Sequence, residues 1–330
     1  MRKTSIGGSA LLEGIMMIGP HKKAIAVRKP DGEVELLVEN LPKKRKLAKI
    51  PIIRGAYSLI YQMVLSIRAL TYAASFYDLE EDEKNIPDKS KKADVITEEF
   101  SDLVTEQTEN SPLEDKSKKN KEKDTETLSK TAVFFSILLS VGITVGLFIL
   151  LPNFIIGLLK IQNTAVNNLL EGVLRISIFI GYIILVTLMK DIRRVWMYHG
   201  AEHKTINCYE AGEELTVENV RKYTTSNRRC GTSFLFLVLV VSIVVFSFVG
   251  WHSPLINMLI RILLLPLVAG LAYELVKLAG RYDNLFSRVI SAPGLLFQKL
   301  TAKEPDDGMI ECAIMAFNAV LPQNEEEAKW

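Results

Sequence analysis

Long apolar runs alternate with strongly polar stretches along this chain, and the pattern predicts a membrane protein. Four segments each approach the roughly 20 apolar residues that a helix needs to cross a bilayer. They cover residues 131–151, 172–189, 232–250 and 254–275. We expect them to form two transmembrane hairpins, over residues 131–190 and 232–276.

A further helical pattern, over residues 51–77, carries Arg54 and Arg68 within apolar sequence. An arginine near the bilayer centre costs about 3 kcal/mol on insertion scales. We therefore expect an amphipathic helix that is interfacial or partly inserted. Arg261, near the start of the fourth span, is expected to extend its side chain back to the outer boundary.

The polar parts of the chain predict a small α+β unit and a linker. Residues 1–50 contain two strand-like runs, 24–28 and 33–38, which the turn residues Pro30, Asp31 and Gly32 would join into a β-hairpin. Residues 78–130 are charged and nearly free of aromatic residues, so we expect a disordered linker.

The C-terminal segment, residues 277–330, contains a helical pattern over 309–320 whose apolar stripe needs a partner, most simply the N-terminal strands. Asp306 and Asp307 precede it and would cap its N-terminus, with metal binding as the alternative. The fold class expected is a mainly α membrane protein with about four transmembrane helices, an amphipathic helix and a small α+β cytoplasmic part formed by the two terminal segments.

Basic residues set the expected orientation. They gather in the loop 191–231 and after residue 276, whereas residues 251–253 contain no lysine or arginine. The positive-inside rule therefore places both termini and the 191–231 loop in the cytoplasm of a multi-pass cell-membrane protein. A net charge of +2 gives no indication of a nucleic-acid partner. The three cysteines form no CxxC pair, and thiols on the cytoplasmic side are expected to be reduced.

The candidate chemistry lies in the 191–231 loop, in the order His199-Gly200-Ala201-Glu202-His203. On a helix, His199 and His203 stand one turn apart on a common face and can bind one Zn²⁺ or another divalent transition metal. H-x-x-E-H is the order of the inverted zincins, in which the glutamate takes a proton from metal-bound water. Glu202 would be that general base.

A third ligand must come from elsewhere in the chain. Glu274, a carboxylate at the cytoplasmic end of the fourth span, is the first candidate. Cys230, at the entry to the third span beside two arginines that would stabilise its thiolate, is the second. Cys208 and His21 are weaker candidates. The alternative is that the histidines are hydrogen-bonding groups at the membrane boundary and bind no metal.

Five blocks of sequence together resemble a known family. The blocks are Gly7–Pro20, His199–Lys204, Arg229–Phe234, Ser291–Gly294 and Glu304–Asp307. They resemble the YqhQ-like family, bacterial membrane proteins that carry a domain of unknown function and are described as predicted metal-dependent enzymes. Family members often have a His-Pro pair where this chain has Asn227-Arg228. That departure puts a site drawn from residues 227–230 in doubt and favours Glu274.

Three functions remain open from the sequence. The leading hypothesis is a membrane-embedded metal-dependent hydrolase that faces the cytoplasm, with a peptide bond as substrate by analogy with zinc proteases. The second is a non-catalytic scaffold or assembly factor that binds a membrane or cytoplasmic protein partner. The third is a transporter subunit, which the scarcity of polar residues in the spans disfavours.

Overall fold

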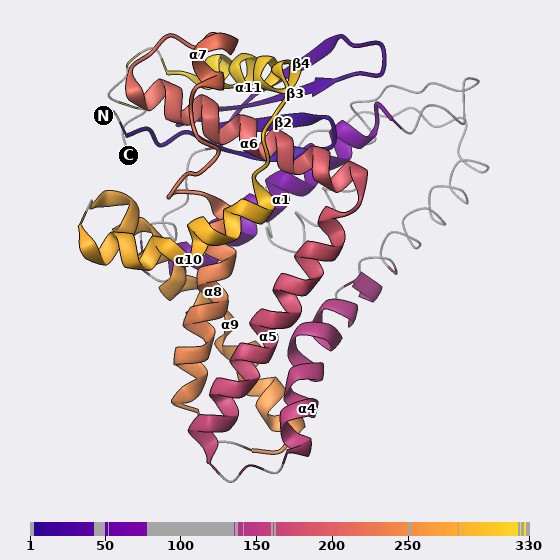
Figure 1. The fold of residues 1–330 in the computed structure, drawn as a ribbon, viewed down its shortest axis with the longest axis vertical. Coiled ribbons are helices and arrows are strands. Elements are labelled where there is room, and N and C mark those ends of the chain that lie inside the picture. The colour runs from indigo at the N-terminus through magenta and orange to yellow at the C-terminus, as the bar shows by residue number, and fades with distance from the viewer. Residues whose placement is uncertain are drawn as a thin grey trace, which may run out of the picture.

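The computed structural model describes residues 3–42, 50–51, 53–77, 135, 138–140, 142–159, 161, 163–249, 252–282, 284–322, 324 and 327. Over these residues the chain is mostly helical, with one small N-terminal sheet. Figure 1 shows a layered α/β part that contains both ends of the chain, and a bundle of long helices extending from it. The predicted linker, residues 78–130, lies outside the described residues.

The sheet is an antiparallel meander in chain order, β1 (Gly7–Leu11), β2 (Gly14–Ile18), β3 (Lys22–Arg28) and β4 (Val34–Asn40). The predicted hairpin corresponds to β3 and β4, and Gly32 adopts φ +88° in the turn between them. We did not predict β1 and β2, because their glycines interrupt the apolar alternation that signals a strand.

Helices cover both faces of this sheet. Alternate residues of β2 and β3, such as Ile15 and Met17, pack on α6 (Lys190–Ala211) and α11 (Asp307–Val320). The intervening residues, such as Met16, pack on α1 (Ile53–Ala74). The C-terminal helix therefore covers the N-terminal strands as predicted. Asp306 caps it, since its Oδ1 accepts a hydrogen bond from Met309 N at 2.9 Å.

The bundle contains the apolar helices. A π-helical turn (Gly146–Leu150) continues into α4 (Leu151–Leu158), and α5 (Thr164–Thr187), α8 (Gly231–Ser247) and α9 (Pro254–Arg281) follow. Three of the described helices are long and apolar enough to cross a membrane, over Leu138–Leu158, Thr164–Thr187 and Leu255–Arg281. The third predicted span corresponds to α8, which is shorter. The first predicted span ended at residue 151, but the helix continues to Leu158, with Pro152 directly after the π-helical turn.

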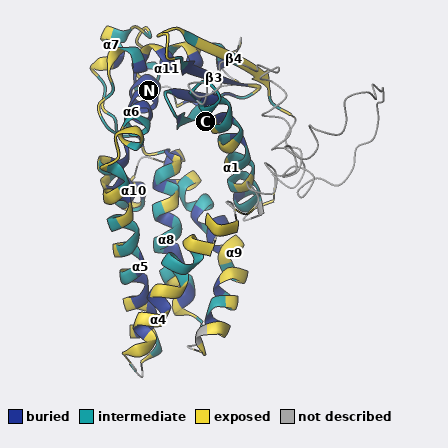
Figure 2. Cartoon of the chain, turned by 90° about the vertical axis from the view of Figure 1, so that its right-hand side faces the viewer, coloured by how far each residue is buried: buried dark blue, intermediate teal, exposed yellow. Residues whose placement is uncertain are grey.

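Two further helices complete the fold. α7 (Val217–Arg221) follows α6, and α10 (Leu285–Thr301) joins α9 to the segment that leads into α11. Figure 2 shows the buried residues concentrated in the α/β part, whereas the helices of the bundle have many exposed positions. The candidate chemistry of the sequence lies where α6 faces the start of α8.

Candidate metal centre

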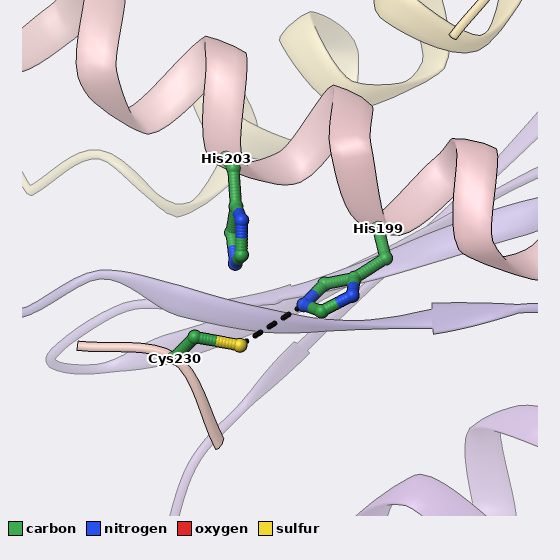
Figure 3. Close-up of side chains that lie close together, drawn as sticks. All are labelled: His199, His203 and Cys230. Atoms are coloured by element: carbon green, nitrogen blue, oxygen red, sulfur yellow. Dashed lines mark hydrogen bonds between the residues drawn. The ribbon is translucent and has the colours of Figure 1, made fainter. Parts of the chain in front are cut away.

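Helix α6 places His199 and His203 one turn apart in the interior of the α/β part. Their ring centroids are 4.3 Å apart, and both side chains are buried. The helix passes through this region without a break and ends at Gly212, which adopts φ +84°. The helical spacing that the sequence suggested therefore exists, and it turns both imidazoles toward the same side (Figure 3).

Backbone carbonyls fix the orientation of both rings. His199 Nδ1 lies 2.6 Å from the carbonyl oxygen of Thr301, and His203 Nδ1 lies 2.5 Å from that of Thr225. A carbonyl only accepts, so each Nδ1 carries a hydrogen and donates it. Each Nε2 is then directed away from the carbonyls, as in histidine ligands of metals, whose second nitrogen is held by a hydrogen bond.

Gly200 permits this close approach. A Cβ atom at residue 200 would lie 1.8 Å from the carbonyl oxygen of Lys303. Beside this contact, the Lys303 N–H donates a hydrogen bond to the carbonyl oxygen of Trp196 at 2.9 Å. The strand-like segment after α10 therefore lies against α6 only because residue 200 has no side chain, and this contact presents the Thr301 carbonyl to His199.

Cys230 completes a cluster of three ligand atoms. It is the N-cap of α8, and its Sγ lies 3.0 Å from His199 Nε2 and 3.3 Å from the amide nitrogen of Thr232. The ligand atoms of His199, His203 and Cys230 all lie within 4.8 Å of one another, and all three residues are buried. Figure 3 shows the thiol of Cys230 opposite the two imidazoles.

The cluster changes the ionisation of its members. Burial would raise the pKa of Cys230, but the facing His199 and His203 rings outweigh it and hold this pKa well below its usual range. Burial would likewise lower the pKa of His199, yet Cys230 raises it to about 9. We expected neighbouring arginines to stabilise the thiolate. Arg229 instead forms an ion pair with Glu210, so the imidazoles have that role.

Glu202 lies beside the cluster with one oxygen available. Burial, together with the charge of Cys230, raises the pKa of Glu202 above its usual range, although the charges of His199 and His203 act in the opposite direction. Its Oε2 is buried and has no hydrogen-bond partner among the described residues. A buried carboxylate oxygen without a donor is costly, so its retention favours a role with a ligand or a water molecule.

The donor set fits a transition metal. His203 Nε2 is buried and also has no partner among the described residues, although its ring is fixed by Thr225. Two imidazole nitrogens and one thiolate suit zinc, and three protein ligands leave a fourth position open, as in catalytic zinc sites. A pocket of about 50 Å³ adjoins this position and is lined by His203, Cys230 and the N-terminal residues 4–7.

The other ligand candidates lie apart from this cluster. Glu274, the first candidate, is bound by the guanidinium of Arg54, with its Oε1 2.6 Å from Arg54 Nε, so an ion pair between α9 and α1 takes up the carboxylate. Cys208 is buried in the hydrophobic core of the α/β part, near the segment that follows α6, and burial raises its pKa to about 11. His21 lies on the surface, 2.8 Å from Glu327.

Several residues that organise the site could not be identified beforehand. Arg229 joins Glu210 of α6 to the carbonyl oxygen of Thr4, at 3.2 Å from the latter, and Thr4 N donates to Glu210 at 2.7 Å. These contacts hold the N-terminal segment against the pocket. The sequence offered one signal, the Arg229-Cys230 pair itself, which we had interpreted as charge stabilisation of the thiolate.

Comparison with known proteins identifies a family. Residues 50–323 match the family described as protein of unknown function (DUF1385). The chain is also 30% identical over 323 residues to the uncharacterized protein YqhQ of Bacillus subtilis (strain 168), covering 96% of this chain and 92% of that protein. No solved structure matches the chain. The match over most of its length shows that this chain belongs to the DUF1385 family of proteins of unknown function.

Proposed function

We propose that this protein is a membrane-embedded, metal-dependent hydrolase whose centre is formed by His199, His203 and Cys230. The observation that carries the proposal is the buried, partnerless Nε2 of His203 beside a thiol and a second imidazole. An unpaired buried acceptor costs about 1–3 kcal/mol, and a metal ion bound to it would remove that cost.

In this proposal the chain's own residues perform three tasks. The Thr301 and Thr225 carbonyls hold the two imidazoles with Nε2 toward the centre. A zinc ion bound there would lower the pKa of its water to near 7 and polarise a substrate carbonyl. Glu202 would accept the proton from that water on Oε2 and return it to the leaving group.

The surface of the helical bundle supports the membrane part of the proposal. Large apolar side chains on its helices face outward, including Leu185 on α5 and Leu263 on α9, which are 66% and 79% exposed. Apolar surface on this scale is typical of contact with lipid or another protein. Positive-inside bias would place the metal centre and both termini in the cytoplasm.

Helix α1 has the pattern of an interfacial helix. Its exposed apolar residues recur at helical spacing, at Ile60, Met63, Ile67 and Leu70, while Leu65 packs on the sheet. The stripe lies on the side of the helix that the sheet does not cover. We propose that it contacts the bilayer at the cytoplasmic boundary, as the sequence pattern suggested.

Elemental analysis of the detergent-purified protein tests the metal centre. We expect about one zinc ion, or another transition-metal ion, per wild-type chain and its loss in a His199→Ala/His203→Ala double variant. Glu274→Gln is the matched control, because Glu274 binds Arg54 and not the cluster, and it should retain the metal. A folded wild-type sample without metal, even after remetallation, would refute the hydrolase mechanism and favour the scaffold hypothesis.

The Cys230–His199 pair supports a second candidate, a cysteine-dependent hydrolase without metal. The 3.0 Å separation of Sγ and Nε2 and the lowered pKa of Cys230 are the features of an activated thiolate nucleophile. Chelation separates the two candidates. Removal of the metal should abolish hydrolysis by a metal centre, whereas it should leave or increase hydrolysis by a thiolate and its alkylation by iodoacetamide.

A further inference from the structure

One buried side chain of α10 contacts the chain on both sides of Cys230. Gln298 lies in the last turn of α10 and is buried. Its Oε1 accepts a hydrogen bond from the Asn227 N–H at 2.9 Å. Its Nε2 donates to the carbonyl oxygen of Asn227 and to Ser233 Oγ, both at 2.6 Å. Asn227 and Ser233 stand three positions before and three positions after Cys230, so Gln298 joins the two ends of the segment that carries the thiol.

The backbone of Asn227 allows only one orientation of this amide. An N–H group only donates and a carbonyl only accepts, so the amide oxygen of Gln298 must face the first and its nitrogen the second. In this orientation the side chain makes three hydrogen bonds, and both hydrogens of Nε2 are used. In a buried network each bond restrains the others. Gln298 therefore fixes the backbone of Asn227 as a neighbouring strand would.

Two further contacts extend this restraint to Cys230. Asn227 Oδ1 accepts a hydrogen bond from Arg229 N at 2.9 Å, an Asx turn that directs the chain into α8, where Cys230 is the N-cap. On the other side of the thiol, α10 packs closely on α8, since a Cβ atom at Gly294 would lie 2.5 Å from Ser233 Cβ. Gly294 lies one turn before the glutamine on the same face of α10. The segment around Cys230 is therefore held to α10 at both of its ends.

The same turn of α10 also holds His199. In Figure 1, α10 lies where the helical bundle meets the α/β part. The carbonyl oxygen of Thr301, three residues after Gln298, lies 2.6 Å from His199 Nδ1 and accepts its hydrogen. One helical turn thus contacts His199 through a carbonyl and the Cys230 segment through an amide. The 3.0 Å separation of Cys230 Sγ and His199 Nε2 is therefore set by a single element.

We propose that Gln298 is a positioning residue of the metal centre, which keeps Cys230 at the distance from the two imidazoles that a shared metal ion requires. It acts through Asn227 and Ser233 and would touch neither the metal nor the substrate. Buried partners that orient metal ligands typically contribute about 10- to 100-fold to metal affinity. This inference rests on the function proposed above, because it assigns the residue that places the third ligand of that centre.

A pair of variants on α10 separates positioning from stability. Gln298→Met keeps a side chain of similar length and removes all three hydrogen bonds. The two imidazoles keep their own bonds to backbone carbonyls, so the histidine ligands should remain in place. Asn284→Ala is the matched control, because Asn284 caps the other end of the same helix, where its Oδ1 accepts from Ser287 N at 2.9 Å. It should destabilise α10 without disturbing the segment around Cys230.

The readout is the absorption spectrum of the full-length, Co²⁺-substituted protein in detergent. A thiolate bound to Co²⁺ gives a strong charge-transfer band in the near ultraviolet, and Cys230→Ser provides the reference spectrum without a thiolate. We expect wild type and Asn284→Ala to show this band. Gln298→Met should lose most of it and bind Co²⁺ about 10- to 100-fold more weakly. A glutamine with only a structural role would lower the unfolding temperature and leave the band per bound ion unchanged.

The outcomes distinguish this inference from the function on which it rests. An unchanged band and affinity in Gln298→Met would refute the positioning role and leave the metal centre. Co²⁺ binding by wild type without the band would show that Cys230 is not a ligand and would also refute the inference. A folded wild type that binds no Co²⁺ would refute both.

A milder variant provides the test if Gln298→Met fails to fold. Ser233→Ala removes only one of the three hydrogen bonds of Gln298. We expect a weaker charge-transfer band and an affinity for Co²⁺ that is lower by about fivefold, the typical effect of one hydrogen bond. A band and an affinity equal to those of wild type would contradict the positioning role.

Discussion

Two buried polar clusters lie in different parts of the molecule and differ in how their groups are satisfied. In the α/β part, His203 Nε2 and Glu202 Oε2 are buried without hydrogen-bond partners among the described residues. In the helical bundle, the carboxylate of Glu171 is bound by two arginines. Its Oε1 lies 2.5 Å from both Arg175 and Arg261, and its Oε2 also contacts Arg261.

The bundle cluster also satisfies its arginines by other means. Arg175 Nε donates to the carbonyl oxygen of Phe148 at 2.9 Å. The guanidinium carbons of Arg175 and Arg261 lie 5.6 and 5.5 Å from the centre of the Phe246 ring. We expected Arg261 to extend to the outer boundary. It is buried instead, because an inward-facing carboxylate offers a better partner for its charge than exposure at the helix end.

The difference separates a structural role from a functional one. Charges buried with their partners join α5 to α9 and leave little capacity to bind anything further. A buried lone pair without a hydrogen-bond partner destabilises the unbound chain, and this free-energy cost is removed only when a ligand binds to it. Burial is common to both clusters, and Glu171 Oε2 likewise makes no hydrogen bond among the described residues, but it contacts the guanidinium of Arg261 in an ion pair. His203 Nε2 and Glu202 Oε2 have neither a hydrogen bond nor an ion pair among those residues, and this difference distinguishes the candidate metal centre.

The largest effect is expected when the bundle cluster loses its only acid. Glu171→Gln leaves Arg175 and Arg261 buried side by side without a counter-charge, and removal of one partner from a buried ion pair costs about 3–5 kcal/mol. Thermal unfolding in detergent should show a correspondingly lower midpoint. Adding Arg261→Met to the same chain removes the excess charge and should restore part of the loss. A single variant as stable as wild type would show that the ion pairs contribute little.

A smaller effect is expected when the metal ligands are kept but the backbone contact that orients His199 is disturbed. In Gly200→Ala the new methyl group clashes with the Lys303 carbonyl and moves the neighbouring Thr301 carbonyl away from His199. Loss of such an orienting contact typically lowers metal affinity about 10- to 100-fold. Competition with a chromophoric chelator measures this, with Gly212→Asn as a control at a glycine remote from the ligands. Unchanged affinity in Gly200→Ala would contradict the orienting role of Thr301.

The smallest effect is a dependence of metal affinity on pH. His199 has a pKa of about 9 and must lose its proton before Nε2 can bind a metal, whereas Cys230 is already deprotonated because its pKa is well below its usual range. Affinity should therefore rise about tenfold per pH unit from pH 7 to 8 and level off above pH 9. Titrations in buffers of different ionisation enthalpy should detect one proton released per metal ion. Affinity independent of pH over this range would mean that His199 is not a ligand.

How far the site could be predicted depends on whether a feature is local. The relation between His199 and His203 follows from helical periodicity, and the apolar patterns of α5, α9 and α11 likewise indicated helices. By contrast, β1 and β2 gave no recognisable pattern. Gly7 and Gly8 of β1 and Gly14 of β2 have no side chains, so pairing with neighbouring strands specifies these two strands.

The sequence by itself determined the apolar helices, the amphipathic pattern of α1, the capping of α11 by Asp306, and a pair of histidines one helical turn apart. Only the tertiary structure decided that Cys230 faces that pair while Glu274 binds Arg54. Both candidates were plausible in chemistry and in expected depth. The physical reason is that backbone geometry fixes which neighbours along a helix share a face, whereas contacts between distant segments depend on how whole layers pack. Here two contacts decided which candidate faces the histidines. The α10–α11 connection packs against Gly200, and α1 packs against α9.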